Sequence, residues 1–329
     1  MSFVRLRYNR AMKRKGYLIF LLLVLVASGL FLKRNVFVDW YKLRGYNPPV
    51  EVVELADKTT LLENWRRLFY VNRPEVAEPA AFNTHCRENE FTIVLGCYIS
   101  GQNGIYLLNV TDERLEGIKE VTAAHEFLHA AYERLGRSER DRIDALLTQT
   151  YVNLKNTRIR DTIELYRKKD PGVVTNELHS ILGTEVRELP AGLNEYYRRY
   201  FSDRLKIVAY SEQYEQAFVE RRDAVREYAG QLAALKPEID ALGKSLKQTE
   251  DELKAQKSQM ESLRSSGKTN EYNAVVPVYN AKANQYNRDF DRLNELIVRY
   301  NELVQRHNSI VAEEAELIDA IDSRDIVTE

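Results

Sequence analysis

Several residue types on which particular protein classes depend are scarce in this chain. Its 329 residues include only two cysteines and five histidines, and no CxxC pair or Cys/His group occurs. These absences argue against a sulfur-ligated metal site. The formal charge is −1, and no basic patch beyond the N-terminal segment is interleaved with aromatic residues, so we expect no nucleic-acid partner. After about Tyr210 the sequence is long, charged and nearly free of glycine. The residues before Tyr210 have room for one globular core.

The N-terminal residues predict a membrane anchor. Residues 16–32 form one uncharged apolar run, roughly 26 Å long as a helix, which is near the lower limit for crossing a bilayer. Six basic residues and no acidic residue precede this run, so the N-terminus should remain in the cytoplasm and everything beyond Lys33 should lie outside. The alternative is a signal peptide that is cleaved near residues 27–29.

Cys86 and Cys97 predict a disulfide. They are eleven positions apart and flank the strand-like run 91–95. In an oxidising compartment they would most simply pair with each other. A second β-rich stretch ends at Val110, and the turn-forming cluster 100–104 separates the two stretches. This order predicts a β-hairpin.

The most informative motif is His-Glu-x-x-His, formed by His125, Glu126 and His129. Two imidazoles four residues apart lie one turn from each other on a helix and can hold one Zn²⁺ between them. The glutamate beside the first histidine can then polarise a zinc-bound water. The motif therefore predicts a zinc peptidase.

The motif lies in a predicted helix. Apolar residues recur at helical spacing from Leu115 to Leu135, with Thr111 as a plausible N-cap and Gly136 as a plausible C-terminal stop. Both histidines fall on this apolar stripe, where burying an imidazole costs about 1 to 3 kcal/mol unless its nitrogens are satisfied. A metal would remove that cost. The alternative is a pair of hydrogen-bonded core histidines with Glu126 as a solvated neighbour.

A catalytic zinc needs a third protein ligand and an open position for water. A second helix is predicted over 175–185, with Thr175 as its cap. Its Asn176-Glu177 pair, followed by Ser180, resembles the N-E-x-x-S/A ligand helix of the gluzincins, the thermolysin-like zinc peptidases. The resemblance implies that Glu177 is the third ligand. Two alternatives stay open: Glu185, eight residues on and near the same face, or an ordinary first-turn acid at Glu177.

A weaker resemblance runs further along the chain. Glu177, Glu185, Leu189-Pro190 and the aromatic run 196–201 are similar to the region after the ligand glutamate in MtfA-type and anthrax-lethal-factor-type peptidases. Together the likenesses cover about residues 90–205. They imply a zincin body in which the strand before the HExxH helix forms an edge of the cleft.

The resemblance also suggests further site residues. An exposed edge can bind an extended peptide through main-chain hydrogen bonds, so residues 105–110 are the candidate substrate strand, the alternative being an ordinary edge strand. Tyr197, or Tyr196, is a candidate for stabilising the oxyanion, although most such tyrosines are core residues. His179 should face away from Glu177 and be structural. Ile181 stands where thermolysin-like proteins have a supporting Asp, so the partner that orients the histidines is unidentified.

The C-terminal third predicts a coiled-coil hairpin around a polar turn at 265–270. Pro237 and Pro277 should kink or restart a helix. Such hairpins are most often spacers or self-association elements, although an Asn-Tyr face could bind an envelope partner. The first seam has three and four spacing and consists of Leu232, Leu235, Ile239, Leu242, Leu246, Thr249, Leu253, Gln256, Met260 and Leu263. The second has heptads of Tyr272, Tyr279, Tyr286, Leu293, Tyr300 and His307, interleaved with Val276, Ala283, Phe290, Ile297, Val304 and Val311.

These features predict an α+β fold, mainly α, in three parts. The parts are a cytoplasmic tail and transmembrane helix at 1–35, a zinc metallopeptidase-like domain at 36–205, and an antiparallel coiled coil at 206–329. We expect a membrane-anchored, extracytoplasmic endopeptidase that cuts a peptide or protein substrate.

In the expected mechanism one Zn²⁺ per chain is held by His125, His129 and Glu177. The metal lowers the pKa of its bound water, while Glu126 accepts the water proton and passes it to the leaving amine. The alternative is a non-catalytic, membrane-anchored coiled-coil scaffold with a degenerate zincin domain. Retention of Glu126 argues against a scaffold, because a scaffold needs no general base.

Overall fold

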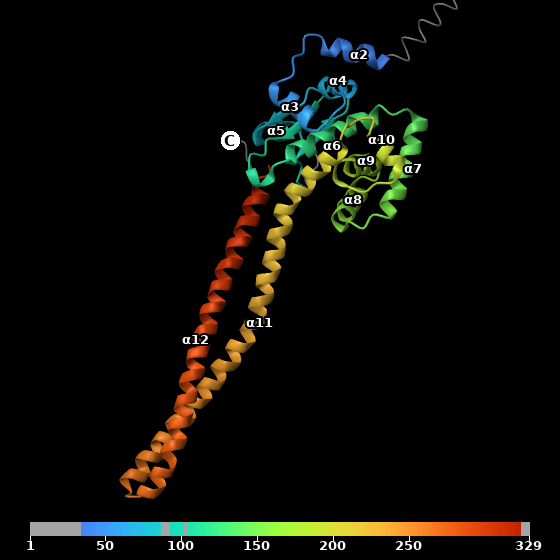
Figure 1. Ribbon diagram of the computed structural model, residues 1–329. Coiled ribbons are helices and arrows are strands. Elements are labelled where there is room, and N and C mark those ends of the chain that lie inside the picture. The colour runs from blue at the N-terminus through green and yellow to red at the C-terminus, as the bar shows by residue number, and fades with distance from the viewer. Residues whose placement is uncertain (1–33, 87–92, 102–103, 324–329) are drawn as a thin grey trace, which may run out of the picture. The chain divides into compact units, whose positions relative to one another are not determined.

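The computed structural model describes residues 34–86, 93–101 and 104–323, and the fold is mainly helical with one small sheet, as predicted (Figure 1). The predicted membrane segment, 16–32, lies outside the described residues. Within the described ranges, no helix combines the length and apolar character needed to cross a bilayer.

Contacts between residues divide the chain into two units. The first is Met1–Gln213 together with Ile321–Glu329, and the second is Tyr214–Ala320. The first unit contains the short elements, which are α2 (Arg34–Leu43), α3 (Val50–Lys58), α4 (Glu63–Val71), β1 (Glu75–Ala77), α5 (Pro79–His85), β2 (Gly96–Ile99), β3 (Gly104–Leu108), η1 (Glu113–Leu115), α6 (Ile118–Glu133), α7 (Arg137–Val152), α8 (Thr157–Lys169), α9 (Val174–Glu185) and α10 (Ala191–Tyr197). The second unit consists of most of α11 (Arg204–Ser265) and α12 (Thr269–Asp319).

The sheet has the strand order β1-β3-β2, with β1 parallel and β2 antiparallel to β3. The predicted hairpin is confirmed, but its first strand is Gly96–Ile99 and not 91–95, of which 91 and 92 lie outside the described residues. The proposed substrate strand, 105–110, is wrong. It coincides with β3, whose two sides already pair with β1 and β2, so it has no free edge for a peptide. In the described part of the chain, the outer strand next to the hairpin turn is β2.

The disulfide between Cys86 and Cys97 is confirmed, with its Cα atoms 5.8 Å apart. Cys86 is the residue that ends α5, and Cys97 lies in β2. The bond therefore ties the outer strand of the sheet to the helix that packs against β1 and β3.

The HExxH helix starts later than the sequence indicated. Thr111 is not its N-cap, since Asp112 instead caps the short 3-10 turn η1 by accepting a hydrogen bond from the Arg114 N–H. Gly117 then precedes α6 with a φ of 96°, and a Cβ there would lie 2.8 Å from Tyr210 Cβ. Only glycine combines this backbone angle with so close a neighbour. At the other end, α6 stops at Glu133, and Gly136 is the N-cap residue of α7.

Phe127, on α6, lies at the centre of the core. Its ring makes edge contacts with Trp65, Phe69, Tyr200 and Phe201, at centroid distances of 5.8 to 6.5 Å. Burying a large aromatic side chain contributes about 1.5 to 3 kcal/mol. Phe127 is adjacent to Glu126, so this packing fixes the rotation of the helix that carries the motif.

Helix α9 packs directly on α6. Gly183 allows the close approach, because a Cβ at this position would lie 2.5 Å from Leu128 Cδ1. The helix begins at Val174, with Val173 rather than Thr175 as the flanking residue. The α6–α9 pair is the frame on which the candidate site is built.

The second unit is a helical hairpin, in which α11 and α12 run side by side (Figure 1). The turn between them contains Gly267 with a φ of 69°, as the polar cluster at 265–270 predicted. All ten residues of the first predicted seam are buried or half-buried. Pro237 and Pro277 do not restart a helix; each lies inside a continuous one. The long paired seam offsets the roughly 3 kcal/mol cost of an internal proline.

One row of the second seam is displaced. The six heptad residues that begin with Tyr272 and end with His307 are half-buried, as predicted. In the interleaved row, however, Phe290, Ile297 and Val311 are exposed. From position 289 onward the inward row lies one residue earlier in each heptad, and it includes the buried Leu303. The three later heptads have adjacent apolar residues, Leu296-Ile297, Leu303-Val304 and Ile310-Val311, so spacing alone could not select the inward one.

Candidate metal centre

Three metal-binding side chains converge where α9 packs on α6. His125 and His129 lie one turn apart on α6, with ring centroids 4.8 Å apart, and Glu177 approaches them from the first turn of α9. One ligand atom from each residue lies within 4.8 Å of the others. In the described ranges this is the group of histidine, cysteine and acidic residues that could hold a metal ion. The structure thus brings together the three predicted ligands.

The distances between these atoms fit a metal better than direct hydrogen bonds. His125 Nε2 lies 3.6 Å from Glu177 Oε2, and His129 Nε2 lies 3.7 Å from Glu177 Oε1. Hydrogen bonds would be shorter than about 3.2 Å, whereas ligands about 2.0 to 2.1 Å from a tetrahedral Zn²⁺ stand about 3.3 Å from each other. Glu177 Oε2 is buried and has no hydrogen-bond partner. A cation at this point would satisfy that orphaned oxygen.

Glu177 is ionised more readily than an ordinary glutamate. Burial acts to raise its pKa, but the two imidazoles and the hydroxyl of Tyr166 outweigh burial, and the net effect is a lowered pKa. A carboxylate that stays charged while buried is suited to binding a cation. The side chains of His125, His129 and Glu177 keep 18%, 10% and 14% of their surface exposed, so the group can be reached from outside.

Glu126 is buried beside the three ligands. It is only 5% exposed, and the backbone of Tyr98 in β2 lies near its carboxylate. Burial, together with the charge of Glu177, raises its pKa to about 7, although His129 and the Tyr98 N–H act in the opposite direction. A carboxyl group with a pKa near neutrality can both accept and donate a proton at physiological pH.

Gly96 allows β2 to lie against this carboxyl group. A Cβ at Gly96 would lie 2.5 Å from Thr122 Cγ2 and 3.0 Å from both Cγ and Oε1 of Glu126. Any larger residue would push the outer strand away from α6. The strand is held further along by Glu133, which accepts hydrogen bonds from the hydroxyls of Tyr98 and Ser100.

Ser180 supplies the histidine partner that sequence reasoning did not find. Its hydroxyl oxygen lies 3.2 Å from Nδ1 of His129, and both atoms are buried. The contact leaves Nε2 of His129 facing Glu177. Ser180 belongs to the Asn176-Glu177 motif, which by itself predicts no role for the hydroxyl. It lies one residue before Ile181, the position at which the resemblance would place a supporting acid.

Tyr166, on α8, is a second residue that sequence reasoning missed. Its hydroxyl lies close enough to Glu177 to favour the charged form of that carboxylate. Burial and three nearby carboxylates, Glu177 first among them, raise the pKa of Tyr166, so it remains a neutral donor. No local signal marks this tyrosine, because it comes from a different helix and follows no motif.

Glu185, the alternative third ligand, lies elsewhere. It is at the C-terminal end of α9, two turns from Glu177, and it forms a 2.6 Å ion pair with Arg158. Two helical turns correspond to about 11 Å. The geometry therefore favours Glu177 as the metal-binding acid.

Tyr196, Tyr197 and His179 form a buried polar cluster. His179 Nε2 is 2.8 Å from the Tyr196 hydroxyl, and burial lowers the pKa of His179 well below its ordinary value. Tyr197 is completely buried, and its hydroxyl donates to the backbone carbonyl of His179. This geometry does not support the predicted catalytic role of Tyr197, because its hydroxyl is already committed within the core. A structural role for His179 agrees with its surroundings.

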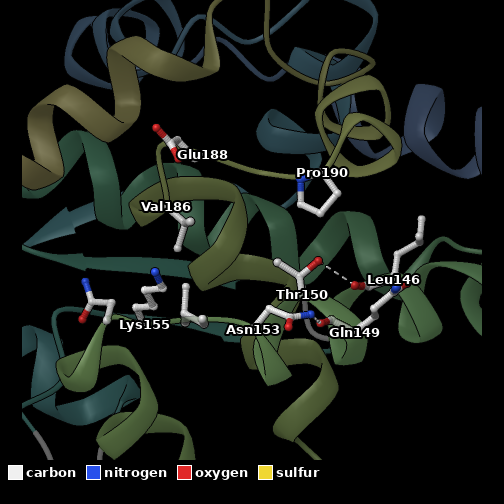
Figure 2. A pocket seen from close by; sticks show the side chains of 10 residues that line it. Leu146, Gln149, Thr150, Asn153, Lys155, Val186, Glu188 and Pro190 are labelled. Atoms are coloured by element: carbon white, nitrogen blue, oxygen red, sulfur yellow. Dashed lines mark hydrogen bonds between the residues drawn. The ribbon is translucent and has the colours of Figure 1, made fainter.

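A separate hollow of about 510 Å³ lies beyond the end of α9, and Figure 2 shows its walls. Its lining residues are Leu146, Gln149, Thr150, Asn153, Leu154, Lys155, Asn156, Val186, Glu188 and Pro190. Thr150 and Asn153 donate to the carbonyls of Leu146 and Gln149 within their own helix. The three candidate metal ligands do not line this hollow, so it is distinct from the metal centre.

Comparison of the chain with protein-family models, curated proteins and solved structures found no match. The assignment of the site therefore depends on its own geometry and chemistry.

Proposed function

We propose that the chain is a zinc-dependent endopeptidase. The observation that carries the proposal is the meeting of His125, His129 and Glu177 beside the buried carboxyl group of Glu126. When bound by these three ligands, zinc would polarise the scissile carbonyl and lower the pKa of a water molecule.

Each surrounding residue then has a defined task. Glu126 would accept the water proton and pass it to the leaving amine, because its carboxyl group is buried directly beside the three ligands. Ser180 would hold the ring of His129 in its orientation, and Tyr166 would hold the carboxylate of Glu177. These contacts limit the motion of the ligands and keep their geometry fixed.

The substrate would bind as an extended peptide along β2. This strand is the outer one beside the site, and its Gly96 lies directly against the side chain of Glu126. A peptide added to such an edge is held by main-chain hydrogen bonds, which do not depend on its sequence. Specificity would then come from side-chain pockets on either side of the strand.

The cellular setting that we propose is a membrane surface outside the cytoplasm. It is supported by the apolar run at 16–32, the basic residues before it and the disulfide between Cys86 and Cys97. The helical hairpin would act as a spacer, a self-association element or a binding element for an envelope partner.

The test combines metal analysis with cleavage of a random peptide library by the full-length chain in detergent. We expect about one zinc per chain, and cleavage that a chelator abolishes and added zinc restores. The Glu126→Gln variant should keep its zinc and lose at least about a hundredfold of its activity. Zinc binding without any cleavage would instead support a scaffold, and wild-type turnover in the variant would rule out Glu126 as the base.

A further inference from the structure

Helix α2 presents an aromatic face to its surroundings. Phe37, Trp40 and Tyr41 are 54%, 61% and 72% exposed. Their spacing of three and four residues places them within about 100° of one another on the helix. The neighbouring Val36 is also exposed. Large aromatic side chains gathered on one face of a short helix form an apolar patch that water solvates poorly.

The opposite face of α2 is held by the body of the first unit. Asp39 is 7% exposed and forms an ion pair with Arg134, whose Nη2 lies 2.8 Å from Asp39 Oδ1. Arg134 is the residue that ends α6, and α2 also packs on α4. Because Asp39 faces inward, the three aromatic side chains cannot turn toward the core.

The position of α2 in the sequence indicates what covers this face. The helix starts two residues after the apolar run 16–32 ends. Tryptophan and tyrosine favour the membrane–water interface, because one part of each ring system is apolar and the other can hydrogen bond. A chain that enters the bilayer next to α2 would place these rings at the depth of the lipid headgroups.

We propose that α2 docks its Phe37, Trp40 and Tyr41 face on the lipid bilayer. The proposal rests on the membrane anchor that forms part of the proposed function, but not on zinc or catalysis. Through the Asp39–Arg134 pair, the lipid-bound helix is connected to the end of the helix that carries both histidines. The metal centre would then stay at a fixed distance from the membrane surface, and its substrates would be polypeptide segments close to that surface.

The chain offers a matched pair of probes, because Trp40 and Trp65 are its only tryptophans. Trp65 is half-buried in α4, with its ring packed 4.6 Å from that of Tyr200. The full-length Trp65→Phe and Trp40→Phe variants would be reconstituted in vesicles of phosphatidylcholine and phosphatidylglycerol that contain brominated phosphatidylcholine. Bromine quenches tryptophan fluorescence only at short range.

We expect the emission of Trp40 to fall at least about twofold, most strongly with bromines placed near the headgroups, and that of Trp65 to stay unchanged. In the Trp65→Phe background, Phe37→Asp combined with Tyr41→Asp should reduce the quenching of Trp40 while the chain remains on the vesicles. Absence of Trp40 quenching, or equal quenching in the Asp variant, would overturn the proposal. A chain that does not associate with the vesicles would overturn both this proposal and the anchor, yet leave zinc binding untouched.

Discussion

The hydroxyl oxygen of Ser180 lies 3.2 Å from Nδ1 of His129, in a buried contact between α9 and α6. One short motif on α9 therefore supplies two contacts to His129: Glu177 faces its Nε2 atom, and Ser180 supports its Nδ1 atom. Such support fixes the ring orientation and the nitrogen that is free to bind a metal.

Replacing Ser180 with Ala should weaken zinc binding by about 10- to 100-fold, because His129 loses the partner that orients its ring. The measurement is a competition titration with a chromophoric chelator. Thr184→Ala is the matched control, since Thr184 is buried one turn further along α9 and donates only to the carbonyl of Ser180. Equal zinc affinity in the Ser180 variant and the wild type would show that the contact has no role in metal binding.

Replacing Gly96 with Ala should lower peptide hydrolysis by at least about tenfold while zinc content stays near the wild-type value. The added Cβ would overlap Thr122 Cγ2 and crowd Glu126, and overpacking of this kind costs about 1 to 3 kcal/mol. Kinetics and metal analysis of one preparation would separate the two effects.

Two further variants make the Gly96 experiment specific. Thr122→Ser removes the methyl group at the closest contact and keeps the hydroxyl that donates to the Ile118 carbonyl, so it should restore part of the lost activity. Gly136→Ala should be silent, because a Cβ there meets nothing within 4 Å. Full activity in Gly96→Ala alone would mean that β2 does not need to lie so close to Glu126.

The sequence predicted the elements of the site better than their contacts. His125 and His129 were found because their four-residue spacing places them on one helix face whatever the tertiary structure. Tyr166 could not be found, because its hydroxyl reaches Glu177 only after α8 and α9 have packed together. For the same reason the surroundings of Tyr197 could not be foreseen: its chain position suggested the site, and its hydroxyl bonds to the His179 carbonyl.

The limits of the strands and helices also depend partly on local sequence and partly on tertiary packing. The hairpin was predicted, but β3 became the central strand because the short β1, which has no clear pattern of its own, pairs with it. The chain turns into α6 at Gly117, where Tyr210, more than ninety residues later, lies against the backbone. These outcomes depend on long-range contacts, which local spacing does not contain.

Metal-free protein should show a stability difference between wild type and Glu126→Gln that grows with pH. Burial raises the pKa of Glu126 from an ordinary 4.5 to about 7, so between these values the folded state holds a proton that the unfolded state has released. Wild-type stability therefore falls as pH rises from about 4.5 to 7, relative to a variant that does not titrate. Above pH 7 the difference should approach about 3 kcal/mol.

Urea unfolding of both proteins in chelator, from pH 4.5 to 8, measures this difference. Equal stability at the acid end serves as the internal control, because both side chains are then neutral. A difference that does not change with pH would mean that Glu126 titrates normally. Glu120→Gln offers a second comparison, since Glu120 is also buried on α6 but is paired with Lys58.

Glu177→Ala should lose zinc during dialysis against a mild chelator, while Glu185→Ala should retain it. Glu177 provides a carboxylate oxygen within 4.8 Å of both histidine nitrogens, so its removal takes away a direct ligand. Glu185 instead pairs with Arg158, a residue whose side chain is about half exposed, and loss of that pair should cost no more than about 1 kcal/mol of folding stability. Metal content after dialysis and thermal unfolding would be measured on both variants. Retention of zinc by Glu177→Ala and its loss from Glu185→Ala would move the third ligand to Glu185, and retention by both would mean that a different residue completes the site.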